Sequence, residues 1–245
     1  MEETRAYRRC YTGDLQRHSL VLGETDLAIC LPPGVWQAPV EQGLRDHLIR
    51  LRGQLQAYLA EDPAFAATHS PYTPSLHAPA VAKALAKAGN LAKTGPMAAV
   101  AGYFAAAAGT WLAAYSGDVI VENGGDIYLH SCQPRTVAIY AGPDNPFSGK
   151  LALRLPPEKM PCGVCTSSGT IGPSFSYGVA DAAVVVAADA ALADAVATAA
   201  GNLVKDGDSV AAAVEYALQV SGVWGGVMIC GDKMAAAGDI ELVRL

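Results

Sequence analysis

The hydrophobic positions of this chain change their spacing several times, and each change predicts an element. Short apolar runs over residues 5–11 and 19–31, closed by Pro32-Pro33-Gly34, are typical of strands and predict a β-rich start. Over residues 39–60 leucines recur at helical spacing, with charged and amide side chains on the other side, which predicts an amphipathic helix. The leucines of this pattern are Leu44, Leu48, Leu51, Leu55 and Leu59.

The middle of the chain alternates polar connections with alanine-rich helices. Residues 61–79, rich in Pro, Ser and Thr, predict a surface loop that is either a lid or a simple connector, with His69 and His77 facing solvent. A short helix is expected up to about Ala88. Residues 97–115 contain no charged side chain, but most are Ala or Gly, so this segment predicts a buried helix rather than a membrane span.

The second half begins with a predicted hairpin. Apolar runs on either side of Asn123-Gly124-Gly125 indicate two strands joined by a tight turn, because an Asn-Gly pair readily adopts positive φ at the two central positions. Glu122 and Asp126 flank this turn and would place carboxylates beside a bound molecule. Further strands are expected near 136–140, 150–155, 226–230 and 239–243, and a helix near 208–220.

The stretch 163–202 combines a polar loop, an apolar strand and a helix. The run 180–188 is apolar almost throughout, as in a strand buried on both faces. Asp189 then suits the N-cap of a helix that ends near Gly201-Asn202. The whole order predicts an α+β fold of two intimately packed halves, each β-rich and then helical, in one domain spanning 1–245 with a possible subdomain split near 116–120.

The loop of this stretch is a candidate anion site. Thr166, Ser167, Ser168, Gly169 and Thr170, followed by Ile171 and Gly172, bring four hydroxyls and two glycines into seven positions. Backbone N–H and hydroxyl groups at such a density can converge on a phosphate. An ordinary turn-rich connection is the alternative interpretation.

The following helix carries a candidate metal pair. Asp194 and Thr198 stand four residues apart and therefore on the same helix face. A carboxylate and a hydroxyl so placed can share one hard cation, with Mg²⁺ the best match. Alternatively, Asp194 is a surface residue and Thr198 bonds back to its own helix.

Composition and charge narrow the classes of function. The 245 residues are 51% hydrophobic and 16% charged, which indicates a globular protein. A net charge of −6 argues against nucleic acid or an anionic membrane as partner. The many alanine-rich helices would also suit burial against a second copy of the chain.

Six cysteines spread along the chain, with no signal sequence, are typical of reduced thiols in the cytoplasm. Cys162 and Cys165 form a CxxC, for which redox or metal chemistry is one interpretation. A small apolar Cys165 entering the loop is the other.

Three motifs, taken together, resemble the ApbE-like superfamily, whose best known members are FAD:protein FMN transferases. They are Gly95–Gly102, the ENGGDI sequence 122–127, and the stretch from Thr166 to Thr198 with its CTSSGT loop and its Asp194-Ala-Val-Ala-Thr198 run. The likeness is greatest to a shorter ApbE-like family. It implies an ApbE-like fold, and the motifs cover about residues 90–205.

The resemblance also implies a site. The turn Asn123, Gly124, Gly125 and Asp126 and the loop 166–170 would line a cleft for a flavin nucleotide, FAD or FMN. Asp194 and Thr198 would hold Mg²⁺ against its pyrophosphate, which agrees with the metal pair proposed from spacing.

The chain departs from the transferases in three places. The histidine-containing segment that follows their Thr-Ser-Gly loop is replaced here by residues 174–181, and no histidine follows His130. The Lys-Gly pair of their early helix is replaced by Val100-Ala101-Gly102. The lipoprotein signal is lacking, so their periplasmic location does not carry over. The catalytic residues are therefore not identified, and Asp181 and Cys165 are the candidates.

Two hypotheses of different class follow. The first is a cytoplasmic binding or accessory protein that holds a flavin nucleotide without the full transfer machinery; the resemblance permits a part in sulfur assimilation toward homocysteine, with Cys165 as a sulfur-handling thiol. The second is an Mg²⁺-dependent FAD:protein FMN transferase or FAD hydrolase, which would need a protein acceptor or water.

Overall fold

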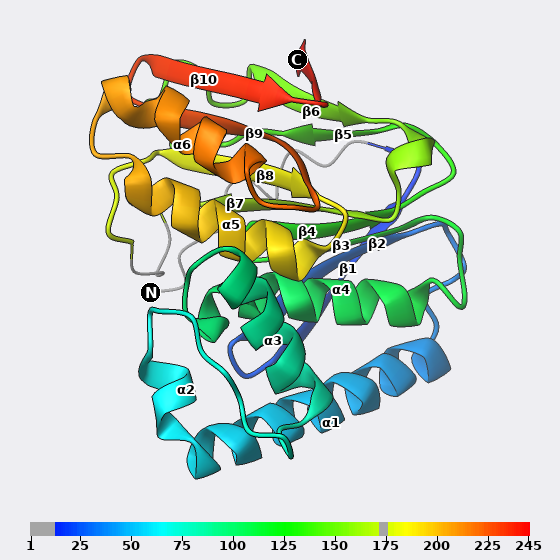
Figure 1. The fold of residues 1–245 in the computed structure, drawn as a ribbon. Helices are drawn as coiled ribbons and strands as arrows, with labels where there is room; N and C mark the ends of the chain where they lie inside the picture. The colour runs from blue at the N-terminus through cyan, green and yellow to red at the C-terminus, as the bar shows by residue number, and fades with distance from the viewer. Residues whose placement is uncertain (1–12, 172–175) are drawn as a thin grey trace.

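A computed structural model describes residues 13–171 and 176–245, so the strand expected over residues 5–11 lies outside the described part. Figure 1 shows a large sheet with helices layered over one of its faces. Eight strands form this sheet in the order β1-β2-β3-β4-β7-β8-β9-β10, and each paired neighbour is antiparallel. Their bounds are Gln16–Leu22 (β1), Thr25–Leu31 (β2), Val119–Asn123 (β3), Asp126–His130 (β4), Cys162–Ser167 (β7), Ala182–Ala187 (β8), Val223–Cys230 (β9) and Lys233–Gly238 (β10).

A second sheet of three strands, in the order β11-β6-β5, packs on the other face of the large sheet. Its strands are Arg135–Ala138 (β5), Leu151–Leu155 (β6) and Glu241–Arg244 (β11). The two faces have separate cores, because side chains alternate along a strand. In β8, for example, Val185 packs toward the helices and Val184 toward the small sheet.

The helices lie on the first face. α4 packs on β3 and β4, α5 on β7 and β8, and α6 on β9 and β10, while α1 and α3 pack on the outer side of α4 and α5. Their bounds are Ala38–Glu61 (α1), Pro63–Ala67 (α2), Ala80–Leu91 (α3), Val100–Leu112 (α4), Ala190–Leu203 (α5) and Val210–Leu218 (α6), with short 3-10 turns at Pro96–Ala99, Pro157–Lys159 and Gly207–Ser209.

Most of the predicted elements are confirmed, and the α+β class with them. The leucine pattern forms α1, the apolar run forms the fully buried β8, and Asp189 caps α5 by accepting from the Leu192 N–H at 3.1 Å. α5 runs to Leu203, slightly past the predicted stop. The described helices include none that is long and apolar enough to cross a membrane.

Three predictions need correction. Residues 61–79 include the short helix α2. Thr166 and Ser167 belong to β7, because they pair with Val184 and Ala183 of β8. β10 was missed, since its Ala235-Ala236-Ala237 core has no alternating pattern. The single domain with a split near 116–120 stays a prediction, although β4 pairs with β7 across the two halves.

Replacing Asp189 by Ala is expected to lower the free energy of unfolding by about 1 kcal/mol, because the Leu192 N–H at the start of α5 loses its acceptor. Urea denaturation measures this. Asp208→Ala is the comparison, as Asp208 is exposed and its carboxylate accepts no hydrogen bond within the described ranges. An Asp189→Ala variant as stable as the wild type would contradict the cap.

Candidate functional site

The ENGGDI hairpin forms a tight turn with two glycines at its centre. Gly124 and Gly125 have φ of 70° and 103°, and Asn123 pairs with Asp126 across the turn. The central positions are therefore Gly-Gly, one residue later than the predicted Asn-Gly. Glu122 folds back so that its Oε1 accepts from the Gly125 N–H at 2.7 Å.

Asn123, at the turn of this hairpin, faces the start of α4. The Asn123 Nδ2 donates to the carbonyl of Ala101 at 3.0 Å. On the opposite side, Asp194 of α5 accepts from the Gly102 N–H through Oδ2 at 2.8 Å. The helix start is thus held between the hairpin and α5, and the Gly95–Gly102 and ENGGDI motifs meet Asp194 in one place.

Asp126 and Asp194 form a buried pair of carboxyl groups. Asp126 is 6% exposed and Asp194 is 9% exposed. The Oδ1 of Asp126 has no hydrogen-bond partner among residues 13–171 and 176–245. Burial, and then the charge of Asp194, raise the pKa of Asp126 well above its ordinary value. Burial raises the pKa of Asp194 to about 7, against the backbone N–H groups at the start of α4, which lower it. Two carboxyl groups buried near one another favour either a bound proton or a cation.

A cavity of about 370 Å³ opens between α1, the start of α4 and the ENGGDI hairpin, and neither Asp126 nor Asp194 lines it. Ala101 and Asn123 line it on the side of the hairpin and α4, and Leu55, Met97 and Phe104 supply apolar walls. Arg52 of α1 stands at its edge, held by Glu24 and by the hydroxyl of Thr25. The cavity therefore combines apolar surface with the Arg52–Glu24 ion pair, the Thr25 hydroxyl and the amides of Gln56 and Asn123.

The predicted metal pair is only partly defined by the structure. Asp194 is buried, and Thr198 lies one turn further along α5 and is half-buried. No group of three or more His, Cys, Asp and Glu side chains in the described ranges is disposed to hold a metal ion. An Mg²⁺ site here would need hydroxyl, carbonyl or ligand oxygens besides Asp194, which Mg²⁺ accepts. A carboxylate and a hydroxyl are oxygen ligands of the kind that Mg²⁺ takes, and the metal pair stays a prediction.

The loop after β7 uses its hydroxyls internally. The Ser168 Oγ accepts from the N–H groups of Thr170 and Ile171 at 3.1 and 3.0 Å. The Thr170 hydroxyl donates to Asp181 at 2.9 Å. Gly169 lies against the Gly178 carbonyl so closely that a Cβ would be 2.2 Å from that oxygen. These contacts favour the turn-rich interpretation for Ser168 and Thr170, while Thr166 and Ser167 lie half-buried at the end of β7.

Both catalytic candidates, Asp181 and Cys165, form hydrogen bonds within the protein. The Oδ2 of Asp181 accepts from the Gly231 N–H at 2.7 Å and from Asn145, and its Oδ1 accepts from Thr170. Cys165 is fully buried and donates to the Ala190 carbonyl at 3.2 Å. Burial and the neighbouring carboxyl groups raise the pKa of its thiol. A thiol in this state is a poor nucleophile.

The CxxC is not a reactive pair. Cys162 packs in the core under the small sheet and Cys165 in the core under the helices, so the two thiols lie on opposite faces of β7. Burial also raises the pKa of Cys162 to about 12. The structure excludes the redox or metal interpretation of this motif.

Thiol alkylation tests this arrangement. In the folded protein at pH 8, iodoacetamide is expected to modify the exposed Cys132 rapidly and to leave Cys162 and Cys165 unmodified until the protein is unfolded in urea. Peptide mass mapping after timed quenching distinguishes the sites. Fast labelling of Cys165 in the folded state would contradict its burial and return it to the candidate nucleophiles.

Two residues of this region were missed by sequence reasoning. Thr94 is 7% exposed, and its hydroxyl has no partner in the part of the chain that the structure describes. Its only sequence signal is its place before Gly95-Pro96. His69 was expected in solvent and is exposed, but its Nδ1 also lies 2.7 Å from the Tyr177 hydroxyl, which links residues 61–79 to the segment after the Ser/Thr loop. That contact joins segments far apart in sequence, so no local pattern predicts it.

Comparisons with known proteins agree with the resemblance. A family model described as AbpE bacteria matches residues 8–221. A UPF0280 protein of Methanocella arvoryzae is 45% identical over 201 residues, which cover 81% of either chain. The solved structure of the flavin transferase ApbE from Vibrio cholerae superposes with a TM-score of 0.60 at 14% identity, covering 91% of this chain and 97% of the other. The apo form of the flavinyl transferase ApbE from Pseudomonas stutzeri gives 0.57 at 15% identity, covering 94% and 95%.

At these identities the two solved structures establish a common fold, and the predicted ApbE-like fold is confirmed. The family itself rests on the sequence matches, which cover most of the chain. Because the model spans residues 8–221 and the archaeal relative shares 45% of the aligned positions, this chain belongs to the AbpE bacteria family and is a relative of the UPF0280 proteins.

Proposed function

We propose that this protein binds a flavin nucleotide, FAD or FMN, in the cavity between α1 and the start of α4, together with Mg²⁺ at Asp194 and Thr198. One observation carries the proposal: the Asp126 Oδ1 is buried without a hydrogen-bond partner among the described residues and lies within reach of the charge of Asp194, while Asn123 of the same turn and Ala101, next to the Gly102 that Asp194 contacts, line the cavity. A buried carboxyl pair without a cation is costly, so a ligand that brings one would be favoured.

The cavity suits the two chemical parts of such a ligand. Its apolar walls from α1 and α4 match a planar ring system, and Asn123 and Arg52 offer polar contacts at its edge. Asp194 and Thr198 would hold the ion, whose charge would neutralise phosphate oxygens. Thr94, whose buried hydroxyl lacks a partner among the described residues, is a further candidate contact.

Binding rather than transfer is the activity we propose. Both candidate catalytic groups are bound within the protein, Cys165 by the Ala190 carbonyl and Asp181 by three donors. Neither is placed as a general base. The FMN transferase or FAD hydrolase alternative remains testable, because both reactions cleave the pyrophosphate and release AMP.

The test is a titration of the purified protein with FAD and with FMN, with and without Mg²⁺, followed by flavin fluorescence. We expect Mg²⁺ to strengthen FAD binding at least tenfold, and Asp194→Asn to remove that gain, because the amide cannot supply the anionic ligand. Asp232→Asn, at an exposed position, is the matched control.

Chromatography of the same samples decides the activity. Intact FAD supports a binding protein, whereas AMP in the wild type that disappears in Asp194→Asn supports the enzyme. FAD affinity that is independent of Mg²⁺ and equal in both variants would refute the proposed site.

A role in sulfur assimilation toward homocysteine and a cytoplasmic location are the remaining parts of this proposal. Cys30, Cys132, Cys162, Cys165 and Cys230 form no disulfide with one another, as expected of a reducing compartment. Since Cys165 is buried, we expect Cys165→Ser to leave homocysteine formation in the host unchanged and deletion of the protein to reduce it. Unchanged homocysteine after deletion would remove the pathway from the proposal.

A further inference from the structure

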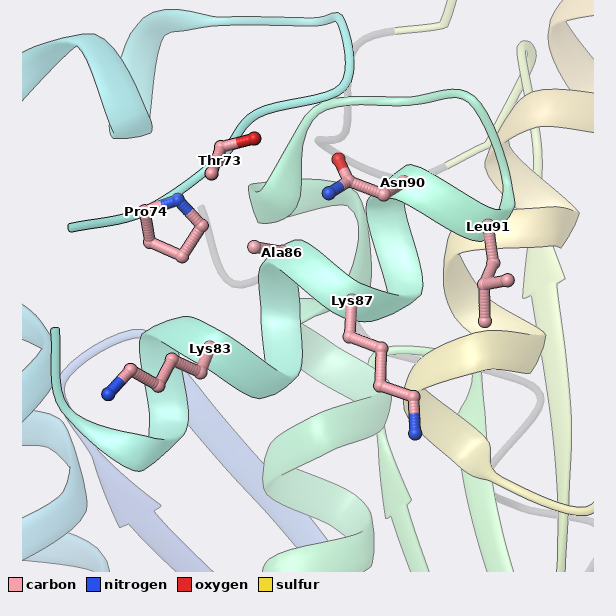
Figure 2. A pocket seen from close by; sticks show the side chains of 7 residues that line it. All are labelled: Thr73, Pro74, Lys83, Ala86, Lys87, Asn90 and Leu91. Atoms are coloured by element: carbon pink, nitrogen blue, oxygen red, sulfur yellow. The ribbon is translucent and has the colours of Figure 1, made fainter. Parts of the chain in front are cut away.

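A second cavity lies on the outer side of α3, away from the carboxyl pair. It has a volume of about 460 Å³ and opens between α3 and the segment that precedes it. Thr73 and Pro74 line one side, and Lys83, Lys87, Asn90 and Leu91 line the other (Figure 2). We call it the α3 groove. Figure 2 shows the two lysine side chains extending from α3 one turn apart.

The groove has a fixed wall. Asn90 accepts from the Tyr72 N–H at 2.8 Å and donates to the Tyr72 carbonyl at 3.0 Å, which holds the facing segment against α3. Further along the segment, the Ser75 N–H donates to the Tyr58 hydroxyl at 3.1 Å, and Lys83 donates to the Leu76 carbonyl at 2.8 Å. The groove is therefore formed before anything binds, which lowers the entropic cost of binding.

Its charge is opposite to that of the whole protein. Residues 63–117 contain three lysines and no acidic residue, although the chain carries a net charge of −6. The ion pairs of the described residues do not include Lys83 or Lys87. The nearby carboxylate, Asp62, is turned toward the hydroxyls of Tyr58 and Tyr72. The Lys87 ammonium is thus available to an external anion, and the Lys83 ammonium keeps two of its three donors beyond the Leu76 carbonyl.

Two exposed leucines lie at or near the groove. Leu91 lines it and is 44% exposed, and Leu76, whose carbonyl accepts from Lys83, is 90% exposed. Leucine side chains held in solvent beside two lysines offer a partner protein apolar contact together with positive charge. A small anion would use the lysines but not this apolar surface.

We propose that the α3 groove is the docking site for an acidic segment of a partner protein, one that carries leucine-type side chains between its carboxylates. The carboxylates pair with Lys83 and Lys87, and an apolar side chain lies against Pro74, Leu76 and Leu91. The inference is independent of flavin binding, since it involves neither Asp194 nor the cavity between α1 and α4.

The experiment uses a fluorescein-labelled synthetic peptide in which Glu and Leu alternate over about twelve residues, with a Gln-for-Glu peptide as the reference. Fluorescence anisotropy with the full-length protein is expected to show binding of the Glu peptide that weakens as salt rises, and no binding of the Gln peptide. Lys83→Glu/Lys87→Glu should weaken the binding at least tenfold, and Leu76→Ser several-fold.

The control variant is Lys150→Glu/Lys233→Glu, which changes the net charge equally on exposed lysines elsewhere; like Lys83, Lys150 donates to a backbone carbonyl at 2.8 Å. It should retain most of the affinity. Equal losses in the two double variants would overturn the proposal in favour of general charge attraction. So would absence of peptide binding to the wild type, or displacement of the peptide by inorganic phosphate at matched ionic strength.

Discussion

Replacing Gly102 by alanine is expected to lower the free energy of unfolding by about 3 kcal/mol or more and to disrupt the candidate site as well. α4 and α5 cross at this glycine, and a Cβ there would lie 2.2 Å from the Ala190 carbonyl oxygen and 2.8 Å from the Cβ of Asp194. A backbone carbonyl cannot rotate away as a side chain does, so the helices must separate. Separation would also stretch the bond between the Gly102 N–H and Asp194.

The matched control is Gly53→Ala in α1. It is also a glycine within a helix, but no atom lies within 4 Å of the position its Cβ would take. This variant should gain up to about 1 kcal/mol, because alanine favours the helix. Urea denaturation of both variants separates crowding from helix propensity. If Gly102→Ala were as stable as Gly53→Ala, the close crossing of α4 and α5 would be wrong.

Much of the fold could be predicted from local patterns. Three of the signals depend only on the segment that contains them: the leucine spacing of α1, the apolar run of β8 and the N-cap Asp189 of α5. β10 could not be predicted in this way, because its run of three alanines shows no alternation of apolar and polar residues. The same limit applied to Thr166 and Ser167, whose strand character comes from pairing with β8.

The site was predictable only in parts. The motifs indicated Asp126 and Asp194 separately, but their closeness depends on α5 packing against β7 beside the hairpin, which no local spacing encodes. For the loop hydroxyls, in contrast, the local pattern predicted more than the structure shows. Their density suggested a ligand, whereas Ser168 and Thr170 form hydrogen bonds within the protein. The residue types alone cannot distinguish ligand binding from internal hydrogen bonding, because the same hydroxyl groups can do either.

The carboxyl pair connects the stability of the protein with its proposed ligand. Where a folded-state pKa is raised, the folded protein holds a proton that the unfolded chain releases, and stability falls as pH rises between the two pKa values. For Asp194 this window extends from about 4, the pKa of an unfolded aspartate, to about 7. A cation bound at the pair would oppose the loss, since it favours the ionised form that burial disfavours.

Relative to the wild type, Asp126→Asn is therefore expected to be more stable at pH 8 than at pH 4, by about 2 kcal/mol or more. Because burial raises the pKa of Asp126, the folded wild type holds a proton that the unfolded chain releases above about pH 4, and this costs stability as pH rises, whereas asparagine has no proton to hold. Urea denaturation at both pH values measures the difference. Asp144→Asn, at an exposed position, should show the same small difference at both pH values.

Mg²⁺ at pH 8 should stabilise the wild type more than Asp126→Asn, because the variant has lost one of the two charges that attract the ion. Parallel stability profiles for Asp126→Asn and the wild type would mean that Asp126 is ionised and solvated at neutral pH, and the carboxyl pair would then no longer support a cation at this site.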